Sequence, residues 1–142
     1  MDSNIVFIDT TKKIYSNDLS ILRSWIVSTA INEGYTVGEL SFTFCDDEYL
    51  HAINVEFLDH DTYTDIITFD YSSDKYLAGE IYISLDRVYE NASLFKQKIN
   101  QEIRRIIIHG VLHLLGYKDK SQEDKAEMTL KEDYYLSLQP DL

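Results

Sequence analysis

The sequence is poor in the residues that cross-link, break or separate chain segments. It contains one cysteine, Cys45, one proline, Pro140, and five glycines among 142 residues. A lone cysteine cannot form an internal disulfide, which favours a reducing cytoplasm. The scarcity of proline and glycine excludes an ordinary interdomain linker and a low-complexity segment. With 44% hydrophobic residues, the chain is expected to form one domain over residues 1–142.

Long apolar runs are also missing. No stretch approaches the roughly 20 apolar residues that a membrane-spanning helix needs. The segment that begins at Met1 lacks the charged region and apolar run of a secretory signal peptide. We therefore expect a soluble cytoplasmic protein with no membrane partner.

Positive charge is scarce, because 13 lysines and arginines stand against 25 acidic residues and the net charge is −12. A non-specific nucleic-acid-binding protein usually has a broad basic face, so this composition argues against such a function. Residues 96–105 are a local exception, with Lys96, Lys98, Arg104 and Arg105 against Glu102. This segment is either a solvated helix face or a patch that contacts phosphates.

Apolar spacing predicts both strands and helices along the chain. Strands are expected at residues 4–9, 39–45, 64–69 and 80–84. Helices are expected from Asn17 or Asp18 to Gly34, from Asp46 or Asp47, over residues 86–97 and 100–115, and from Ser121, which begins a capping box with Asp124. This order predicts an α+β fold with a small mixed four-stranded sheet and about five helices, the late helices lying on one sheet face.

The stretch His109-Gly-Val-Leu-His113-Leu-Leu-Gly116-Tyr-Lys-Asp119 is the strongest functional signal. A helix advances about 100° per residue, so side chains four positions apart return to one face, roughly 6 Å apart along the axis. Two neutral imidazoles so placed can bind one divalent ion. Gly116 allows the chain to turn back and bring a third ligand into reach. Three protein ligands and an open position are typical of a catalytic metal site.

Two histidines on an apolar helix are more often core residues that hydrogen-bond to backbone carbonyls. The glycine and the residue three positions beyond it match the wider spacing of the metzincin zinc helix, His-x-x-x-His-x-x-Gly-x-x-His. However, Gly110 stands where metalloproteases carry their glutamate general base. The motif therefore argues against peptide hydrolysis and leaves open other hydrolyses in which a metal activates water.

The histidine stretch, His109 to Tyr117, resembles the signature of the YbeY-type endoribonucleases. Further similarities follow in the family's order between Asn54 and Tyr135: Thr64-Asp65-Ile-Ile-Thr-Phe69 resembles a Thr-Asp-Val-Leu-Ser-Phe block, Gly79-Glu80-Ile-Tyr-Ile-Ser84 resembles a Gly-Asp-Ile-x-Ile-Ser strand, and Met128 with the acidic residues after Ser121 resembles a closing helix.

This resemblance implies a metal cleft between the histidine helix and the sheet. It also implies hydrolysis of single-stranded RNA in 16S rRNA 3′-end maturation and ribosome quality control. One Zn²⁺, or another divalent transition metal, would be held by His109, His113 and Asp119. The acidic chain is expected to reach its RNA with the help of a basic ribosomal protein or assembly factor.

The sequence departs from the family pattern at two positions. Asp119 occupies the place of a usual third histidine; it is either a ligand, or it caps the last helix or faces solvent. Leu58 occupies the place of an arginine thought to assist catalysis. Lys118 or Lys120 is the hypothesised replacement for that charge, the alternative being that both lysines solvate a loop.

Asp65 is a candidate for two roles, orienting a ligand histidine or acting as a base. Its ordinary alternative is a turn or helix-terminus contact. Two rival functions also remain at this stage. One is a non-nucleolytic metallohydrolase, such as an atypical peptidase or small-molecule hydrolase; the other is a non-enzymatic ribosome-assembly factor whose metal only holds the fold.

Overall fold

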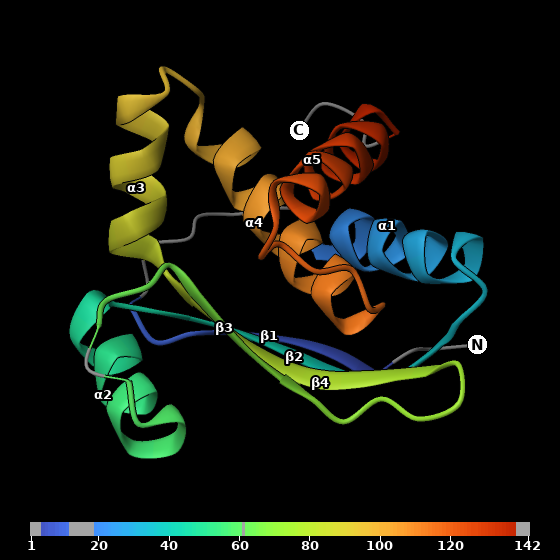
Figure 1. Cartoon of the computed structure of the whole chain (residues 1–142), viewed down its shortest axis with the longest axis horizontal. Helices are drawn as coiled ribbons and strands as arrows, with labels where there is room; N and C mark the ends of the chain where they lie inside the picture. Colours follow the sequence, from blue (N-terminus) through green and yellow to red (C-terminus); the bar gives the residue numbers. More distant parts are fainter. Residues whose placement is uncertain (1–3, 12–18, 61, 139–142) are drawn as a thin grey trace.

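A computed structural model describes residues 4–11, 19–60 and 62–138, and over these residues it has the predicted α+β architecture (Figure 1). The strands are β1 (Asn4–Asp9), β2 (Thr36–Cys45), β3 (Ile66–Asp70) and β4 (Tyr76–Ser84). The helices are α1 (Leu19–Asn32), α2 (Asp47–Leu58), α3 (Leu85–Leu94), α4 (Ile99–Leu114) and α5 (Gln122–Ser137). The expected cap of the first helix, Asn17 or Asp18, lies outside the described residues.

The four strands form one mixed sheet in the order β1-β2-β4-β3. β1, β2 and β4 are parallel, and β3 runs antiparallel to β4. In register, Phe42 of β2 pairs with Phe7 on one side and Ile81 on the other. α1 connects β1 to β2, and a helical connection allows two neighbouring strands to run parallel. No helix separates β3 from β4 in the described chain, so a short turn joins them as an antiparallel pair.

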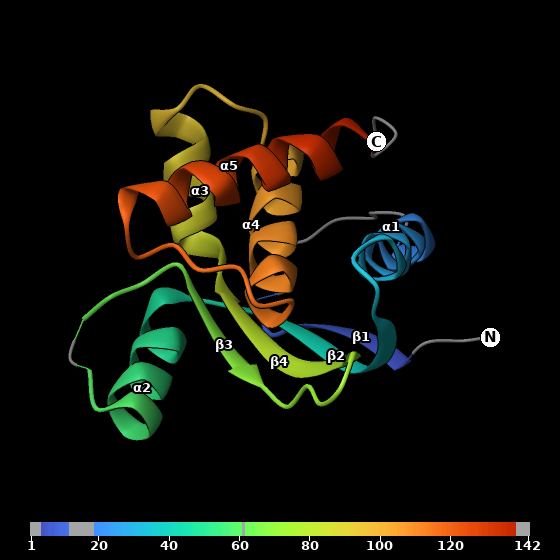
Figure 2. The ribbon, with the colours of Figure 1, turned by 45° about the vertical axis from the view of Figure 1, so that its right-hand side comes forward.

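The helices cover the two faces of the sheet unequally (Figures 1 and 2). α1, α3, α4 and α5 lie on one side, with α4 against the sheet and α5 crossing α4 on its outer side, whereas α2 lies on the opposite side. Side chains alternate along β2: Phe42 and Phe44 enter the main core, and Cys45 joins a smaller cluster with Leu50 of α2 and Ile67 of β3. The late helices therefore share one sheet face, as predicted.

The hairpin between β3 and β4 is tighter than the sequence indicated. The sequence pattern predicts the last strand at residues 80–84, but β4 already begins at Tyr76. The turn is made by Asp74 and Lys75, which have φ angles of 44° and 65°. Two successive left-handed residues are typical of a two-residue hairpin turn, usually signalled by glycine or asparagine. This chain has neither residue there, so the turn was not predicted.

Among the described residues, the helices are all too short or too polar to cross a lipid bilayer.

Candidate metal centre

Helix α4 presents His109 and His113 on one flank and packs its opposite side into the core. Ile107, Ile108 and Leu112 are fully buried, whereas both histidines are partly exposed. Gly110 belongs to the buried side: a Cβ atom there would lie 3.0–3.1 Å from side-chain atoms of Ile66 and Ile81. The position that carries the glutamate in metalloproteases therefore faces the sheet, where even a Cβ atom is tight and a glutamate side chain would enter the core.

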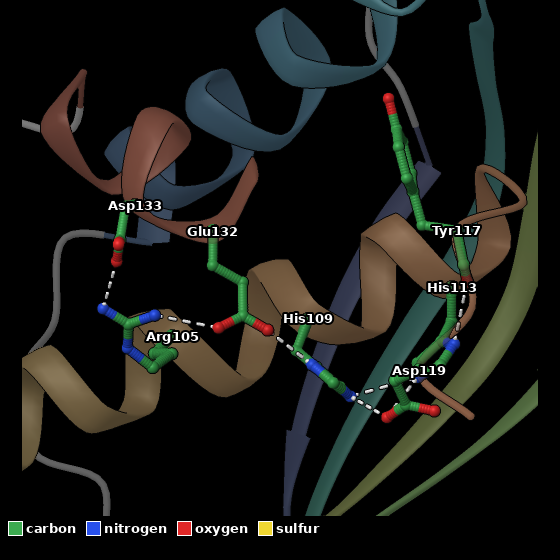
Figure 3. Close-up of polar contacts among 7 residues, drawn as sticks. All are labelled: Arg105, His109, His113, Tyr117, Asp119, Glu132 and Asp133. Carbon is green, nitrogen blue, oxygen red and sulfur yellow. Dashed lines mark hydrogen bonds and ion pairs between the residues drawn. The ribbon is translucent and has the colours of Figure 1, made fainter. Parts of the chain in front are cut away.

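Three side chains converge at the end of α4 (Figure 3). The Nε2 atoms of His109 and His113 are 3.0 Å apart, and Oδ2 of Asp119 lies 3.4 Å and 3.5 Å from them. Gly116 makes this possible with a φ of +104°, which reverses the chain after the helix. Ligands about 2.0–2.2 Å from a tetrahedral zinc ion are about 3.4 Å from one another. These three residues could therefore hold one metal ion.

Asp119 does not cap the last helix. Ser121 is the N-cap of α5, and it forms the predicted capping box with Asp124. The carboxylate of Asp119 instead turns back toward the two imidazoles. The alternative that assigned Asp119 a capping role is wrong, whereas its side chain does face solvent in part, being 41% exposed.

Both imidazoles are oriented by a partner at Nδ1 (Figure 3). Nδ1 of His109 lies 2.6 Å from Oε2 of Glu132, and Nδ1 of His113 lies 3.1 Å from the carbonyl oxygen of Tyr117. Both partners are acceptors, so each Nδ1 carries the proton and donates it. When the rings are neutral, each Nε2 is then the unprotonated nitrogen, and its lone pair points toward the shared position of the triad.

Glu132 is part of a chain of charges between α4 and α5. Its other oxygen, Oε1, accepts from Nη1 of Arg105 at 2.8 Å, and Nη2 of the same guanidinium contacts Asp133 at 2.8 Å. The side chain of Glu132 is only 9% exposed. A buried carboxylate with two cationic or donor partners fits the role of holding a ligand histidine in place.

Sequence reasoning missed Glu132. A signal for it exists, because Met128, Glu132 and Tyr135 are spaced four and three residues apart and all are buried. A carboxylate on the buried stripe of a helix needs a partner within the fold. The spacing could have indicated a partnered acid, but not which residue it contacts.

The two histidines differ electrostatically. For His109, burial opposes protonation, but the hydrogen bond and charge of Glu132 together with the charges of Asp119 and Asp65 leave its pKa raised. For His113, burial and the neighbouring His109 lower the pKa, despite Asp119. Glu132 therefore makes His109 the more basic of the two rings.

Asp65 is close enough to act electrostatically on His109, but in the described part of the chain it shows no hydrogen bond to a histidine ring. It is half-buried just before β3, and its backbone carbonyl accepts from the amide of Ser84 at 2.9 Å. Its charge contributes to the raised pKa of His109. The carboxylate that contacts His109 is Glu132, so orientation by a direct Asp65 hydrogen bond is not seen; a role for Asp65 as a base stays a prediction.

The cations predicted to assist catalysis lie outside the triad. Lys118 and Lys120 are exposed, and Lys118 lines a cavity of about 380 Å³ together with Glu33 and Tyr117. Leu58, where the family pattern has an arginine, is the last residue of α2 and is 39% exposed. The role of either lysine in catalysis stays a prediction.

A second polar cluster holds the connection that carries Asp119. The hydroxyl of Tyr117 donates to Oε1 of Glu33 at 2.7 Å, Tyr135 donates to the other oxygen of Glu33, and Lys131 lies 3.6 Å from it. Although burial raises the pKa of Glu33, these contacts outweigh it and leave the pKa lowered. Glu33 at the end of α1 is therefore charged and ties residues 115–121 to the helical layer.

The basic segment at residues 96–105 does not form a four-cation patch. Arg104 is 7% exposed, and Arg105 is paired with Glu132 and Asp133. Lys96 and Lys98 are exposed in the connection between α3 and α4. From the sequence, residues 96–105 are interpreted as either a solvated helix face or a patch that contacts phosphates. Only Lys96 and Lys98 of this segment's four cations are exposed and available for such a patch.

Comparisons with known proteins agree on one family. A family model described as endoribonuclease YbeY matches residues 4–139. A protein of Christiangramia forsetii named endoribonuclease YbeY is 48% identical over 116 residues, covering 82% of this chain and 81% of the relative. A Flavobacterium psychrophilum protein of the same name is 50% identical over 115 residues, covering 81% and 82%. The solution structure of TM1509 from Thermotoga maritima superposes with a TM-score of 0.67 at 25% identity, covering 94% of this chain and 87% of that one.

Proposed function

This chain belongs to the endoribonuclease YbeY family, and from this premise we propose that it is a metal-dependent hydrolase of phosphodiester bonds in single-stranded RNA. The observation that carries the proposal is the convergence of His109, His113 and Asp119, with Glu132 behind His109. The substrate is rRNA, including the 3′ end of 16S rRNA, and the process is ribosome maturation and quality control.

The metal is Zn²⁺, with another divalent transition metal as the alternative. Two imidazoles and one carboxylate are a known catalytic zinc set, and the distances among His109, His113 and Asp119 suit that set. The carboxylate oxygen also widens the choice toward manganese or nickel. When bound, the ion polarises the phosphate and activates water.

The residues around the metal site have separate roles in binding and catalysis. Glu132 and the Tyr117 carbonyl keep each Nδ1 protonated and so direct both Nε2 lone pairs to the ion. Asp65, whose charge acts on His109, accepts the proton of the attacking water as the water oxygen bonds to phosphorus. The bond from phosphorus to the leaving ribose oxygen breaks, and that oxygen takes a proton from solvent. Lys118 stabilises the negative charge that develops on the phosphate oxygens.

The net charge of the chain supports a role for a protein partner. A chain with a net charge of −12 repels the RNA backbone over most of its surface. A ribosomal protein or assembly factor with a basic surface would complement this charge and bring the rRNA to the centre in the cytoplasm.

Rival functions are less well supported. A peptidase of the usual kind needs the glutamate that Gly110 replaces, and the core leaves no space for it. A non-enzymatic assembly factor with a purely structural metal does not agree with the endoribonuclease activity for which the family is named. Removal of the ion separates these cases, because a structural site unfolds without its metal whereas a catalytic site keeps its fold.

Cleavage of a labelled single-stranded rRNA fragment by the purified, metal-loaded protein tests the proposal. Wild-type protein is expected to cleave, and His113→Ala and chelator-treated protein are expected to lose cleavage while keeping their circular dichroism spectrum. Equal cleavage by wild type and His113→Ala would indicate a contaminating nuclease and would contradict the proposal. Absence of cleavage by metal-loaded wild type would contradict it as well.

A further inference from the structure

A polar cavity of about 450 Å³ lies near the start of α4, away from the metal ligands at its end. It is bounded by the first half of α4, the connection between α3 and α4, and the end of α5. Five of its seven lining side chains are polar: Gln97, Gln101, Glu102, Arg104 and Arg105. The volume falls within the range of about 300–1,000 Å³ that is typical of small-ligand sites.

The cavity and the metal centre share one flank of α4. Glu102 lies two helical turns, about 10 Å along the axis, before His109. Arg105 lines the cavity and also contacts Glu132, which contacts His109. Asp65 acts electrostatically on both Glu102 and His109. A chain bound along this flank can therefore reach both places.

The cavity has an aromatic ring in its lining, and two lysines lie next to lining residues in the chain. Phe95 lines the cavity and is 65% exposed, so its ring is accessible for stacking. Lys96 and Lys98 follow Phe95 in the chain, on either side of Gln97, and both are exposed. Exposed aromatic rings stack on nucleobases, amide side chains hydrogen-bond to base edges, and lysines contact phosphates.

We propose that this cavity binds one unstacked base of the single-stranded RNA, within a few nucleotides of the scissile phosphate. Phe95 stacks on the base, Gln97 and Gln101 hydrogen-bond to its edge, and Lys96 and Lys98 contact the adjoining phosphates. The inference rests on the proposed function and adds a subsite to it. A protein partner fits less well, because the centre of a protein interface is usually apolar and depleted in charge, whereas this cavity is polar.

An abasic scan tests the subsite. A short single-stranded rRNA oligonucleotide is prepared with one abasic nucleotide at each position in turn. Its dissociation constant for His113→Ala protein, which is expected not to cleave, is measured by fluorescence anisotropy. One abasic position near the cleavage site is expected to weaken binding at least fivefold. That penalty is expected to disappear in the Phe95→Ala and Gln101→Ala versions of this protein.

Matched controls come from neighbouring exposed residues that do not line the cavity. Leu94→Ala is the control for Phe95→Ala, and Asn100→Ala is the control for Gln101→Ala. Both controls are expected to keep the abasic penalty. Thermal unfolding of all four variants is expected to match that of the parent, because the four side chains are exposed.

The outcomes separate the subsite from the activity. A penalty that Phe95→Ala and Gln101→Ala leave unchanged, or a scan with no sensitive position, overturns the subsite while cleavage by wild type stands. Weaker binding by Phe95→Ala of every oligonucleotide alike indicates a backbone or folding effect and also overturns it. If Phe95→Ala and Gln101→Ala keep the abasic penalty but no longer bind a purified ribosomal protein, the cavity is a protein-docking surface. That result overturns the subsite too. Failure of metal-loaded wild type to cleave RNA overturns the proposed function.

Discussion

Nδ1 of His109 donates a hydrogen bond to Oε2 of Glu132 across 2.6 Å, joining residues that are 23 positions apart in the chain. This contact links α4 to α5 and fixes which nitrogen of His109 faces His113 and Asp119. The same carboxylate is held by Arg105. The geometry of the candidate metal centre therefore depends on the packing of α5 over α4.

Replacement of Glu132 by glutamine is expected to weaken metal binding about 10- to 100-fold, because a neutral amide holds the protonated Nδ1 of His109 less strongly. Competition with a calibrated chelator measures this affinity. Asp133→Asn is the control: Asp133 is 56% exposed and contacts only the outer side of Arg105, so its loss is expected to change the affinity less than threefold. Equal affinities for wild type and Glu132→Gln would contradict the assignment.

Replacement of Asp119 by alanine is expected to lower metal affinity more than Glu132→Gln does, because it removes a ligand rather than a group behind one. Asp119→His, which restores three imidazoles, is expected to keep metal and to move the acidic limb of the pH–activity profile to lower pH. The reason is that a neutral ligand leaves more positive charge on the site to acidify water. Glu123→Ala, an exposed acid in the first turn of α5, serves as the control. Unchanged metal content in Asp119→Ala would show that Asp119 is not a ligand.

Replacement of Gly110 by glutamate is expected to destabilise the fold by about 3 kcal/mol or more, because it places a charged side chain against Ile66 and Ile81 in the core. Gly110→Ala is expected to cost about 0–2 kcal/mol, since better helix propensity offsets part of the overpacking. Urea unfolding of the metal-free protein measures both. A stable, folded Gly110→Glu protein would show that the core does have space there.

Replacement of Glu33 by glutamine is expected to cost about 1–3 kcal/mol at neutral pH, because the charged acceptor of Tyr117 and Tyr135 is lost. The pKa of Glu33 is lowered in the folded state from its ordinary value of 4.5. Its contribution is therefore fully present above pH 4.5 and is lost as pH falls through the lower folded pKa. Wild type and Glu33→Gln should converge in stability toward acid pH, as urea unfolding between pH 3 and 7 can measure.

The control for that comparison is Glu39→Gln, since Glu39 is exposed on β2. Its stability is expected to stay within about 0.5 kcal/mol of wild type at every pH. A constant difference between wild type and Glu33→Gln across the pH range would contradict the charge-based explanation.

Replacement of Lys118 by alanine is expected to lower kcat about tenfold without changing metal content, if its charge acts on the phosphate. Lys120→Ala is the companion variant, because both lysines are exposed near Asp119. Steady-state cleavage of a short RNA separates kcat from KM. If both variants keep wild-type turnover, neither lysine replaces the arginine that is missing at Leu58.

Much of the fold could be predicted because its signals are local. Alternation over residues 39–45 and the apolar spacing of α4 each depend on a few neighbouring residues, and they placed the sheet and helices within a few positions of their ends. The hairpin at Asp74 and Lys75 escaped prediction, because no glycine or asparagine marks its two left-handed residues. Local patterns predict an element better than they predict an unusual turn.

The spacing of His109, His113, Gly116 and Asp119 can be read from the sequence, since a helix and one reversing glycine bring these residues together over eleven positions. The groups that orient them depend on tertiary packing. Glu132 reaches His109 from another helix, and Glu33 reaches Tyr117 across 84 positions. Such contacts depend on how α1 and α5 pack against α4, and the spacing of apolar residues along one helix does not predict that packing. The metal-ligand spacing is thus a property of one helix and its turn, while the charge and orientation of the centre are properties of the whole helical layer.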